Sequence, residues 1–377
     1  MTVVERPLCV LQILPALEAG GVERGSVEIS EALVRAGHRS LVISGGGSMA
    51  EEITAQGGEH RTLPVGRKSI FSLTLIPALR RLLREESVDI LHARSRWPAW
   101  LAWLAWRGLP AAARPGFVTT VHGFYSVNAY SAIMTRGQRV ICVSEAIREY
   151  VLKQYPGVDP SRLERIHRGI DRGLFPYGYN PDDAWRLQWE KAYPNFRGRK
   201  LLLLPGRITR RKGHHDFISL IAGLRTAGRD VHGLILGGED PNRRTYAGEL
   251  RQAINRAGLA ERITMLGARA DVREIMAVSD LVLSLSTQPE SFGRTTLEAL
   301  SLGRPVLGYS HGGVEEILTH LYPAGLSPVA DRQALIDNAL QLLDQPQPVT
   351  RSDAFTLVQM QSQTLSVYQQ LAARKIP

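Results

Sequence analysis

Cysteine is scarce in this sequence, and long hydrophobic runs are absent. Cys9 and Cys142 are the two cysteines among 377 residues, so a disulfide framework is not expected and a reducing cytosol is the natural compartment. No apolar run reaches the roughly 20 residues that a membrane-spanning helix needs. The opening stretch MTVVERPLCVLQIL carries an acid and a proline and leads directly into a strand-like run, unlike a secretory signal. We therefore expect a cytoplasmic protein.

Acidic residues are outnumbered by basic ones. The chain has 46 Lys and Arg against 36 Asp and Glu, a net charge of +10, which indicates an anionic partner such as a nucleic acid, a membrane surface or a phosphorylated substrate. The excess is local, because residues 61–114 carry 10 basic against 3 acidic side chains. A nucleic-acid-binding protein would also need a basic and aromatic platform or a known reading motif. The sequence contains neither, so nucleic acid is the least favoured partner.

Strand-like and helix-like segments alternate along the whole chain. A chain of 377 residues is long enough for about two domains, and alternating signals imply parallel sheets joined by helical crossovers. The short apolar runs are LCVLQIL, RSLVISGG, VDILHA, GFVTTVHG and RVICVS, and then KLLLLPGR, VHGLILGG, RITMLG, DLVLSLS and RPVLGY. We expect an α/β protein with two doubly wound, Rossmann-like domains that face a cleft.

A polar segment separates the two series of strands. Residues 179–200 are broken by Pro181 and Pro194, and we place the inter-domain connection there. The sequence therefore predicts an N-terminal domain over residues 1–180 and a C-terminal domain over residues 197–351. A helix-like stretch at residues 352–377 follows the second strand series.

The stretch STQPESFGRTTLEALSLGRPVLGY holds two glutamates eight positions apart. Residues 280–286 form the expected strand, Pro289 keeps the chain extended, and Ser291 is the expected helix N-cap. Glu290 then lies at the strand end and Glu298 about two turns into the helix. Eight helical positions span roughly 12 Å, whereas a hydrolase acid/base pair lies about 5 to 9.5 Å apart. The spacing favours two contacts on one extended ligand.

The start of that helix is a candidate phosphate site, because unpaired backbone N–H groups at a helix N-terminus attract anions. A sugar, a diphosphate and a ribose in line would fit between the two glutamates. The candidate residues for binding such a ligand here are Ser291, Phe292, Gly293, Thr295, Thr296 and Glu298.

Glu290 and Glu298 in this setting resemble the signature of retaining glycosyltransferases of the GT-B fold, family 4, of the bacterial lipopolysaccharide and cell-envelope polysaccharide kind. The same family has an arginine and a lysine after the first strand of its C-terminal domain, and GRITRRKG supplies Arg207 and Lys212. Two glutamates at this spacing are a weak signal alone, because chance yields such pairs often. The ordered set, with each member at an expected strand end, is a specific one.

The N-terminal half carries two further points of resemblance. GGVER, with Gly20 and Gly21, is similar to a family loop near the donor phosphates, and VTTVHGF places His122 where the family has a histidine close to the sugar. Glycines allow the backbone to approach a phosphate closely, although Gly-Gly is more often a simple turn. A lone histidine is usually structural, but this one stands at a strand end beside Gly123.

The resemblance also implies roles. Glu298 would accept hydrogen bonds from the ribose hydroxyls, and Glu290 from hydroxyls of the donor sugar; an exposed helix acid is the alternative for each. Arg207 and Lys212 would stabilise the negative charge that grows on the leaving diphosphate, unless GRITRRKG is only a solvated basic turn. The implied mechanism is front-face displacement, in which configuration is retained and a leaving phosphate oxygen takes the acceptor's proton.

Metal chemistry is not expected. A glycosyltransferase of the other main fold would use a D-x-D carboxylate pair for a divalent ion, and no two aspartates of this chain stand two positions apart. The adjacent His214 and His215 and the scattered acids lack metal-ligand spacing. We expect a metal-independent hexosyltransferase with no cofactor, whose donor is a UDP-sugar or a GDP-sugar.

The acceptor side rests on the basic segment. Arg94 and Arg96 follow the strand VDILHA and are the candidate acceptor-binding residues. Tryptophans then recur every three positions, at Trp97, Trp100, Trp103 and Trp106. They belong either to a buried helix or to an interfacial helix whose indoles meet lipid headgroups.

The sequence thus predicts a glycosyltransferase that moves a sugar to a cell-envelope glycan or glycolipid, such as a lipopolysaccharide core, with peripheral contact to the inner face of the cytoplasmic membrane. A nucleotide-sugar epimerase of the same fold is the alternative within enzymes; it would use acid/base residues in the cleft and need no acceptor. A basic nucleic-acid-binding protein is the alternative from another class.

Overall fold

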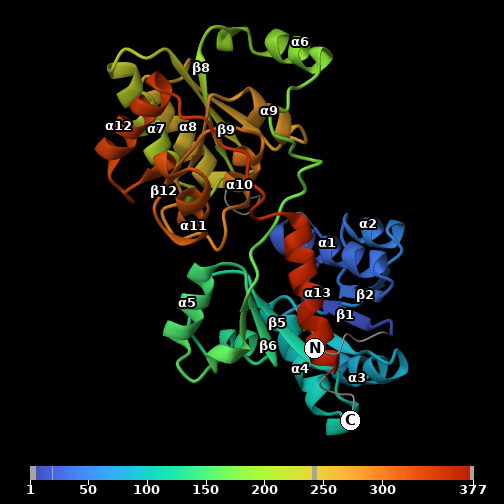
Figure 1. Ribbon diagram of the computed structural model, residues 1–377. Coiled ribbons are helices and arrows are strands. Elements are labelled where there is room, and N and C mark those ends of the chain that lie inside the picture. Colours follow the sequence, from blue (N-terminus) through green and yellow to red (C-terminus); the bar gives the residue numbers. More distant parts are fainter. Residues whose placement is uncertain (1–5, 19, 240–243, 374–377) are drawn as a thin grey trace. The chain divides into compact units, whose positions relative to one another are not determined.

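The chain folds into two compact units. The computed structural model describes residues 6–18, 20–239 and 244–373. Unit 1 comprises Met1–Gly169 and Phe355–Pro377, and unit 2 comprises Ile170–Ala354 (Figure 1). Each unit is built around one parallel sheet flanked by helices, so the predicted α/β class with two Rossmann-like sheets is confirmed.

Unit 1 holds a seven-stranded sheet in the order β3-β2-β1-β4-β5-β6-β7. All neighbouring strands pair in parallel. The central strands are apolar runs buried on both faces, as parallel sheets require. The strands are β1 (Cys9–Ile13), β2 (Arg39–Ser44), β3 (Glu59–Thr62), β4 (Ile90–Ala93), β5 (Gly116–Val121), β6 (Arg139–Cys142) and β7 (Leu163–Arg165).

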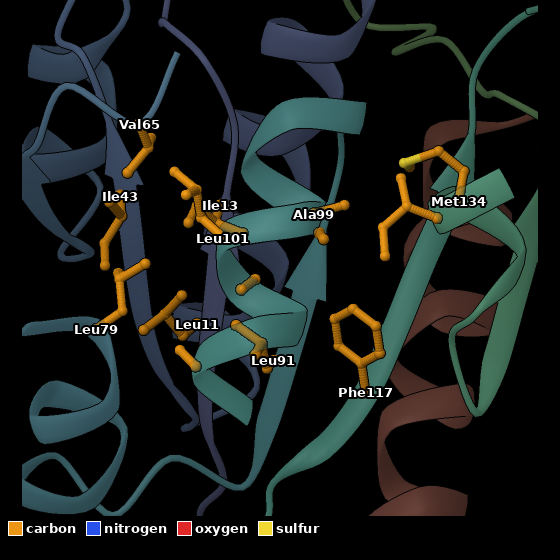
Figure 2. Close-up of a cluster of buried hydrophobic side chains, with 14 of the residues drawn as sticks. Leu11, Ile13, Ile43, Val65, Leu79, Leu91, Ala99, Leu101, Phe117 and Met134 are labelled. Atoms are coloured by element: carbon orange, nitrogen blue, oxygen red, sulfur yellow. The ribbon is translucent and has the colours of Figure 1, made fainter. Parts of the chain in front are cut away.

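Alternate side chains of this sheet feed two separate cores, because successive residues of a strand point to opposite faces. Leu11, Leu91 and Phe117 enter one core together with Leu79 and Leu101 (Figure 2). The helices on that face are α3 (Leu75–Glu85) and α4 (Arg96–Arg107). The remaining helices of unit 1 are α1 (Gly21–Arg35), α2 (Ala50–Ala55), α5 (Glu145–Gln154) and α13 (Leu357–Ala373).

The C-terminal helix α13 covers the opposite face of the unit 1 sheet. Val10 and Ile90 pack with Val367 and Leu371 of this helix, and α13 runs beside α1 (Figure 1). The Tyr368 hydroxyl lies 2.6 Å from His92 Nδ1 in β4, and both side chains are fully buried. Apolar packing and one buried hydrogen bond therefore attach the end of the chain to its first sheet.

Unit 2 holds a six-stranded parallel sheet in the order β10-β9-β8-β11-β12-β13. Its strands are β8 (Lys200–Pro205), β9 (Val231–Leu236), β10 (Ile263–Gly267), β11 (Leu281–Ser284), β12 (Val306–Tyr309) and β13 (Leu326–Ser327). Its helices are α6 (Asp183–Ala192), α7 (His214–Thr226), α8 (Arg244–Arg256), α9 (Val272–Val278), α10 (Arg294–Ser301), α11 (Gly312–Leu321) and α12 (Arg332–Asp344). The strands β8 and β11, separated by about 80 positions in the sequence, are neighbours in the sheet.

The segment predicted as the connection between domains is part of unit 2. The boundary falls after Gly169, whereas residues 179–200 contain α6. Aromatic burial explains the difference: Trp189 is 8% exposed and stacks on Trp185. The Trp185 indole N–H donates to Asp271 Oδ2 at 2.8 Å, which holds α6 against α9. Polar composition and two prolines do not reveal such an anchor.

The tryptophan-rich helix α4 packs against its own unit. All four of its tryptophans are half-buried and contact the apolar core that α3 and α4 cover. Trp100 donates its indole N–H to the Tyr130 carbonyl and Trp106 donates to the Pro115 carbonyl. The structure therefore agrees with the buried-helix alternative. Within the described ranges, no helix is both long enough and apolar enough to cross a membrane.

We expect Tyr368→Phe to loosen α13. The substitution leaves His92 Nδ1 buried without its partner, at a cost of about 1–3 kcal/mol. Hydrogen exchange read by mass spectrometry on peptides of α13 measures the loss. The matched control is Tyr246→Phe in α8, because the buried Tyr246 hydroxyl has no hydrogen-bond partner among the described residues. Equal losses at the two helices would contradict the role given to the Tyr368 hydroxyl.

Candidate active site

The ends of β8 and β11 bring a lysine and a glutamate together. After β8 the chain enters a short 3-10 turn, η6 (Arg210–Lys212), and then turns sharply at Gly213. A Cβ at Gly213 would lie 1.9 Å from the Leu285 carbonyl oxygen, and its φ is 71°, so glycine is required. This turn places Lys212 Nζ 2.5 Å from Glu290 Oε1, although 78 positions separate the two residues.

Glu290 is held by its backbone as well as by its side chain. It forms an isolated bridge with Gly312, and its carbonyl accepts the Gly313 N–H at 2.8 Å. The Ser286 hydroxyl donates to the same carboxylate oxygen that Lys212 contacts. Burial alone would raise the pKa of Glu290, but the Lys212 ammonium and the Ser286 hydroxyl hold it below its ordinary value. The carboxylate is therefore charged at neutral pH.

The helix that carries Glu298 differs from the prediction. It begins at Arg294, with Gly293 as N-cap at φ 98°, so Ser291 is not the N-cap. A Cβ at Gly293 would lie 2.8 Å from Val314 Cγ2, and this close packing decides where the helix starts. Glu298 is consequently about one turn into α10, and its Oε1 lies 3.1 Å from Arg294 Nε.

Because Glu290 precedes the helix, the estimate of roughly 12 Å between the two glutamates, which assumed one continuous helix, does not apply. The other candidate donor-binding residues around Gly293 can offer a ligand mainly their backbone groups. Phe292 is 4% exposed and Thr296 is 1% exposed, while Ser291 and Thr295 are half-buried. The N–H groups of the first turn of α10 are thus the groups that fit a phosphate.

Arg207 lies in the loop between β8 and η6 and is exposed. Its guanidinium makes no hydrogen bond or ion pair with the residues that the structure describes. Arg207 is therefore an exposed cation, and its role at the diphosphate stays a prediction.

Unit 1 places its candidates at the ends of other strands. Gly20 caps α1 in an extended conformation, and Gly21 is the first residue of that helix; position 19 lies outside the described residues. A Cβ on Gly20 would lie 2.2 Å from Glu23 Oε2, so the Glu23 carboxylate already lies against this helix start. A phosphate that binds here has to displace that carboxylate, because two anions repel each other.

His122 directly follows β5 and is half-buried. Its Nδ1 lies 2.7 Å from Arg168 Nη2, and its backbone N–H donates to the Tyr125 hydroxyl. Burial, followed by the charges of Arg168 and Arg94, lowers the pKa of His122 well below its ordinary value. The imidazole is therefore neutral under physiological conditions.

The two acceptor candidates differ in exposure. Arg94 is 2% exposed and donates from Nη1 to Gln12 Oε1 at 2.9 Å, and burial lowers its pKa. The Arg94 side chain is therefore enclosed within unit 1. Arg96 is half-buried at the start of α4, with its guanidinium over the rings of Tyr125 and Tyr130. Acceptor binding by either arginine stays a prediction.

Three site neighbours escaped the sequence analysis: Ser286, Arg294 and Arg168. Ser286 and Arg294 stand within the motif itself, and the position of Ser286 at the end of the expected strand was a usable signal. Arg168 follows β7 in the stretch HRGID, and nothing in that local pattern points to His122, 46 positions earlier.

The adjacent histidines at positions 214 and 215 serve α7 and its packing. Both rings lie edge-on against Tyr246, and burial lowers the pKa of His214 to about 4. Among residues 6–18, 20–239 and 244–373, no group of three or more His, Cys, Asp and Glu side chains is placed to hold a metal ion.

Two parallel-sheet units, each with charged residues at the carboxyl ends of its strands, have the architecture of GT-B glycosyltransferases. Residues 19–174 match the model of Glycosyltransferase Family 4, and residues 186–354 match that of Glycosyl transferases group 1. The chain belongs to this family of glycosyltransferases, as the resemblance implied.

Known relatives are similar over nearly the whole length. N-acetyl-alpha-D-glucosaminyl L-malate synthase of Bacillus anthracis is 25% identical over 342 residues, which are 87% of this chain and 85% of the relative. A glycosyltransferase from Rickettsia africae ESF-5 has a TM-score of 0.84 at 25% identity, over 97% and 98% of the two chains. Alr3699/HepE of Anabaena, solved in complex with UDP and glucose, has a TM-score of 0.81 at 21% identity, over 96% of this chain and 100% of that one; this last likeness concerns the fold.

We expect Lys212→Met to destabilise unit 2, with an effect that depends on pH. The change leaves the largely buried Glu290 carboxylate without its cation. Breaking a fully buried ion pair costs about 3–5 kcal/mol, and because this pair is not fully buried we expect a loss of at most about 3 kcal/mol. In the wild type the lowered pKa of Glu290 stabilises the folded state at pH values above the pKa that Glu290 has in the unfolded chain. This contribution is lost as the pH falls through the pKa that Glu290 has in the folded state. In the variant burial prevails and raises that pKa, so the deficit is largest at neutral pH and shrinks as the pH falls.

Urea unfolding at a series of pH values measures this deficit. The double variant Lys212→Met/Glu290→Gln removes the buried charge and is expected to recover most of the lost stability at pH 7. A deficit that is the same at every pH, or no recovery in the double variant, would contradict the ion pair as its origin.

Proposed function

We propose that this chain transfers a sugar from a UDP-sugar or GDP-sugar to an anionic acceptor, with retention of configuration and without a metal ion. The observation that carries the proposal is the pair Lys212–Glu290, 2.5 Å apart at the ends of β8 and β11. Beside it, Gly312 and Gly313 bond the backbone of Glu290. A cation held by a carboxylate in this way is ready to exchange that partner for a phosphate.

The nucleoside diphosphate is assigned to unit 2. The N–H groups of α10 and the Lys212 ammonium fit the diphosphate, and Glu298 fits the ribose hydroxyls as a hydrogen-bond acceptor. Arg294 Nε lies 3.1 Å from Glu298 Oε1, which keeps the carboxylate ordered. UDP is the first donor to test, because the structurally similar Anabaena protein was solved with UDP and glucose.

The proposed reaction breaks the bond between the anomeric carbon and the leaving phosphate oxygen. As that bond lengthens, negative charge grows on the diphosphate, and Lys212 stabilises it by charge and hydrogen bonding. The acceptor hydroxyl attacks from the same face, its proton passes to the departing phosphate oxygen, and the new glycosidic bond keeps the original configuration. Glu290 accepts hydrogen bonds from sugar hydroxyls and does not act as a nucleophile.

An anionic acceptor is the natural partner of the basic stretch at residues 61–114. The name of the relative from Bacillus anthracis, N-acetyl-alpha-D-glucosaminyl L-malate synthase, includes L-malate, a small anion, which supports an anionic acceptor in general. A cell-envelope glycan or glycolipid such as a lipopolysaccharide core is the acceptor class that we propose for this chain. A nucleotide-sugar epimerase would convert the donor without any acceptor.

Contact with a membrane surface would come from η1 (Ile70–Thr74), not from α4. Ile70 and Phe71 are each 77% exposed, and Arg67 and Lys68, just before them, are also exposed. Apolar side chains next to cations suit the surface of an anionic bilayer, where the rings enter the interface and the charges meet headgroups. We propose η1 as the point of peripheral contact.

We expect UDP or GDP, but not ADP, to raise the unfolding temperature of the wild type. Neither nucleotide should raise the unfolding temperature of Glu298→Ala. A ligand of the folded state at a hundredfold excess over Kd contributes about 2.7 kcal/mol. The matched control is Asp344→Ala, which removes a carboxylate paired with an arginine elsewhere in unit 2 and keeps the response. Stabilisation of both variants alike would overturn the assignment of Glu298 to the ribose.

The same donor then serves in an assay with acceptor present. Lys212→Met is expected to lower kcat at least about a hundredfold, as the loss of one preorganised group at the developing charge does elsewhere. We expect the activity to survive excess EDTA. We also expect the product to have the same anomeric configuration as the donor sugar, as assigned by NMR. Loss of activity in EDTA, inversion, or conversion of the donor without acceptor would each overturn the corresponding part of the proposal.

We expect the protein to sediment with vesicles that contain phosphatidylglycerol and not with neutral phosphatidylcholine vesicles. Phe71→Ser should weaken this binding about tenfold, because a large apolar side chain no longer enters the interface. Leu187→Ser is the matched control, since Leu187 is 71% exposed but lies in α6. Binding that salt does not weaken, or equal losses in both variants, would overturn the role of η1.

A further inference from the structure

The imidazole of His122 has one ring nitrogen bonded and the other unbonded. Nδ1 lies 2.7 Å from Arg168 Nη2, while Nε2 is buried and has no hydrogen-bond partner among the described residues. A buried polar atom without a partner is costly in a folded protein and calls for an explanation. The state of Nε2 depends on what occupies Nδ1.

Arg168 leaves only one arrangement of protons on this ring. A guanidinium has five N–H donors and no acceptor, and it stays protonated in proteins. Nδ1 must therefore accept, which excludes the neutral form with its proton on Nδ1. The doubly protonated form is excluded as well, because it would direct an N–H at the N–H of a cation. The proton of the neutral ring is thus on Nε2.

We propose that Arg168 is a positioning residue that keeps His122 as a neutral ring with a permanent Nε2–H donor. The group that meets Nε2 must accordingly be an acceptor, and an oxygen of the donor sugar is the ligand atom that fits. This last assignment rests on the proposed function; the state of the ring does not.

The surroundings hold the guanidinium in place. Arg168 stands three positions after β7, and its Nη1 lies 3.9 Å from the Met360 sulfur of α13. A Cβ at Gly25 of α1 would lie 2.2 Å from Nη1, so the arginine occupies the space above a glycine. The packing thus fixes the guanidinium from two helices that lie far apart in the sequence.

The other groups that face His122 act in the same direction. His92 lies in β4 and Arg94 directly follows that strand, and both lower the pKa of His122. The Tyr125 hydroxyl accepts from the His122 backbone N–H and does not contact the ring nitrogens. The Nε2–H form is therefore expected to persist as the pH falls through the ordinary titration range of histidine.

The test is a histidine side-chain ¹H–¹⁵N spectrum of the full chain without substrate, with the His122 signal assigned by its loss in His122→Asn. The wild type is expected to show the Nε2–H form across this pH range. In Arg168→Met, which retains no donor, Nδ1–H or doubly protonated ring should appear. Arg168→Lys, a donor without acceptor capacity, should restore the wild-type pattern.

A matched control and a second route keep the test decisive. Arg35→Met also removes an arginine that contacts α13, through Gln361, but it leaves His122 untouched and should keep the wild-type spectrum. Gly25→Ala displaces the guanidinium without removing it and should reproduce Arg168→Met if that variant does not fold. A wild-type ring protonated on Nδ1, or an unchanged His122 signal when Arg168 is lost or displaced, would overturn the proposal.

Turnover provides the functional measurement. Arg168→Met should lower kcat/KM about tenfold or more relative to Arg35→Met, as the loss of one oriented hydrogen bond to substrate does, and Arg168→Lys should recover most of it. A spectrum that responds as expected while kcat/KM does not change would overturn the contact with the sugar. If no nucleotide sugar binds at all, the proposed function fails, and the spectrum, which needs no substrate, still decides the role of Arg168.

Discussion

The parallel arrangement of the strands is the constraint on which the rest of the structure depends. In a parallel sheet the carboxyl ends of all strands lie on the same side of the sheet, so residues distant in the sequence meet there. Lys212 and Glu290 come together because β8 and β11 are neighbours. Gln12 and Arg94 meet in unit 1 because β1 and β4 are neighbours. The loops that leave these strands can therefore vary while the meeting point stays fixed.

Desolvation then decides how the gathered charges behave. A carboxylate that is moved out of water loses hydration free energy, and a charged or hydrogen-bonding partner has to compensate that loss. Glu290 has two such partners, Lys212 and Ser286. Under the proposed function, a phosphate that approaches Lys212 would replace one anion by another, so the ammonium would never lie in the interior without a counter-charge. This exchange lets the free protein keep its cation ordered before the donor arrives, which is the condition for electrostatic stabilisation without reorganisation.

Sequence patterns predicted the strands and the members of the site better than the local geometry. The apolar runs predicted both sheets, and the ordered motifs singled out Lys212 and Glu290, which the structure brings together; the roles of these two residues stay predictions. The start of α10 was wrong, since it is decided by the packing of Gly293 against Val314, a contact between segments that no local pattern encodes. The burial of Arg94 and the pairing of Arg168 with His122 depend likewise on neighbours far away in the sequence.

Under the proposed function, the two units would supply different kinds of recognition. Lys212 in unit 2 acts through its charge, which attracts phosphate at long range and weakens as salt increases. His122 in unit 1, kept neutral by burial and by Arg168, acts through one directed N–H and adds no charge that salt could screen. A charged group suits the diphosphate, on which charge grows, and a neutral donor suits a hydroxyl, whose charge does not change when it binds. Because Glu290, which is proposed to accept hydrogen bonds from the sugar, is also the ion-pair partner of Lys212, binding of the diphosphate and orientation of the sugar are coupled through that pair.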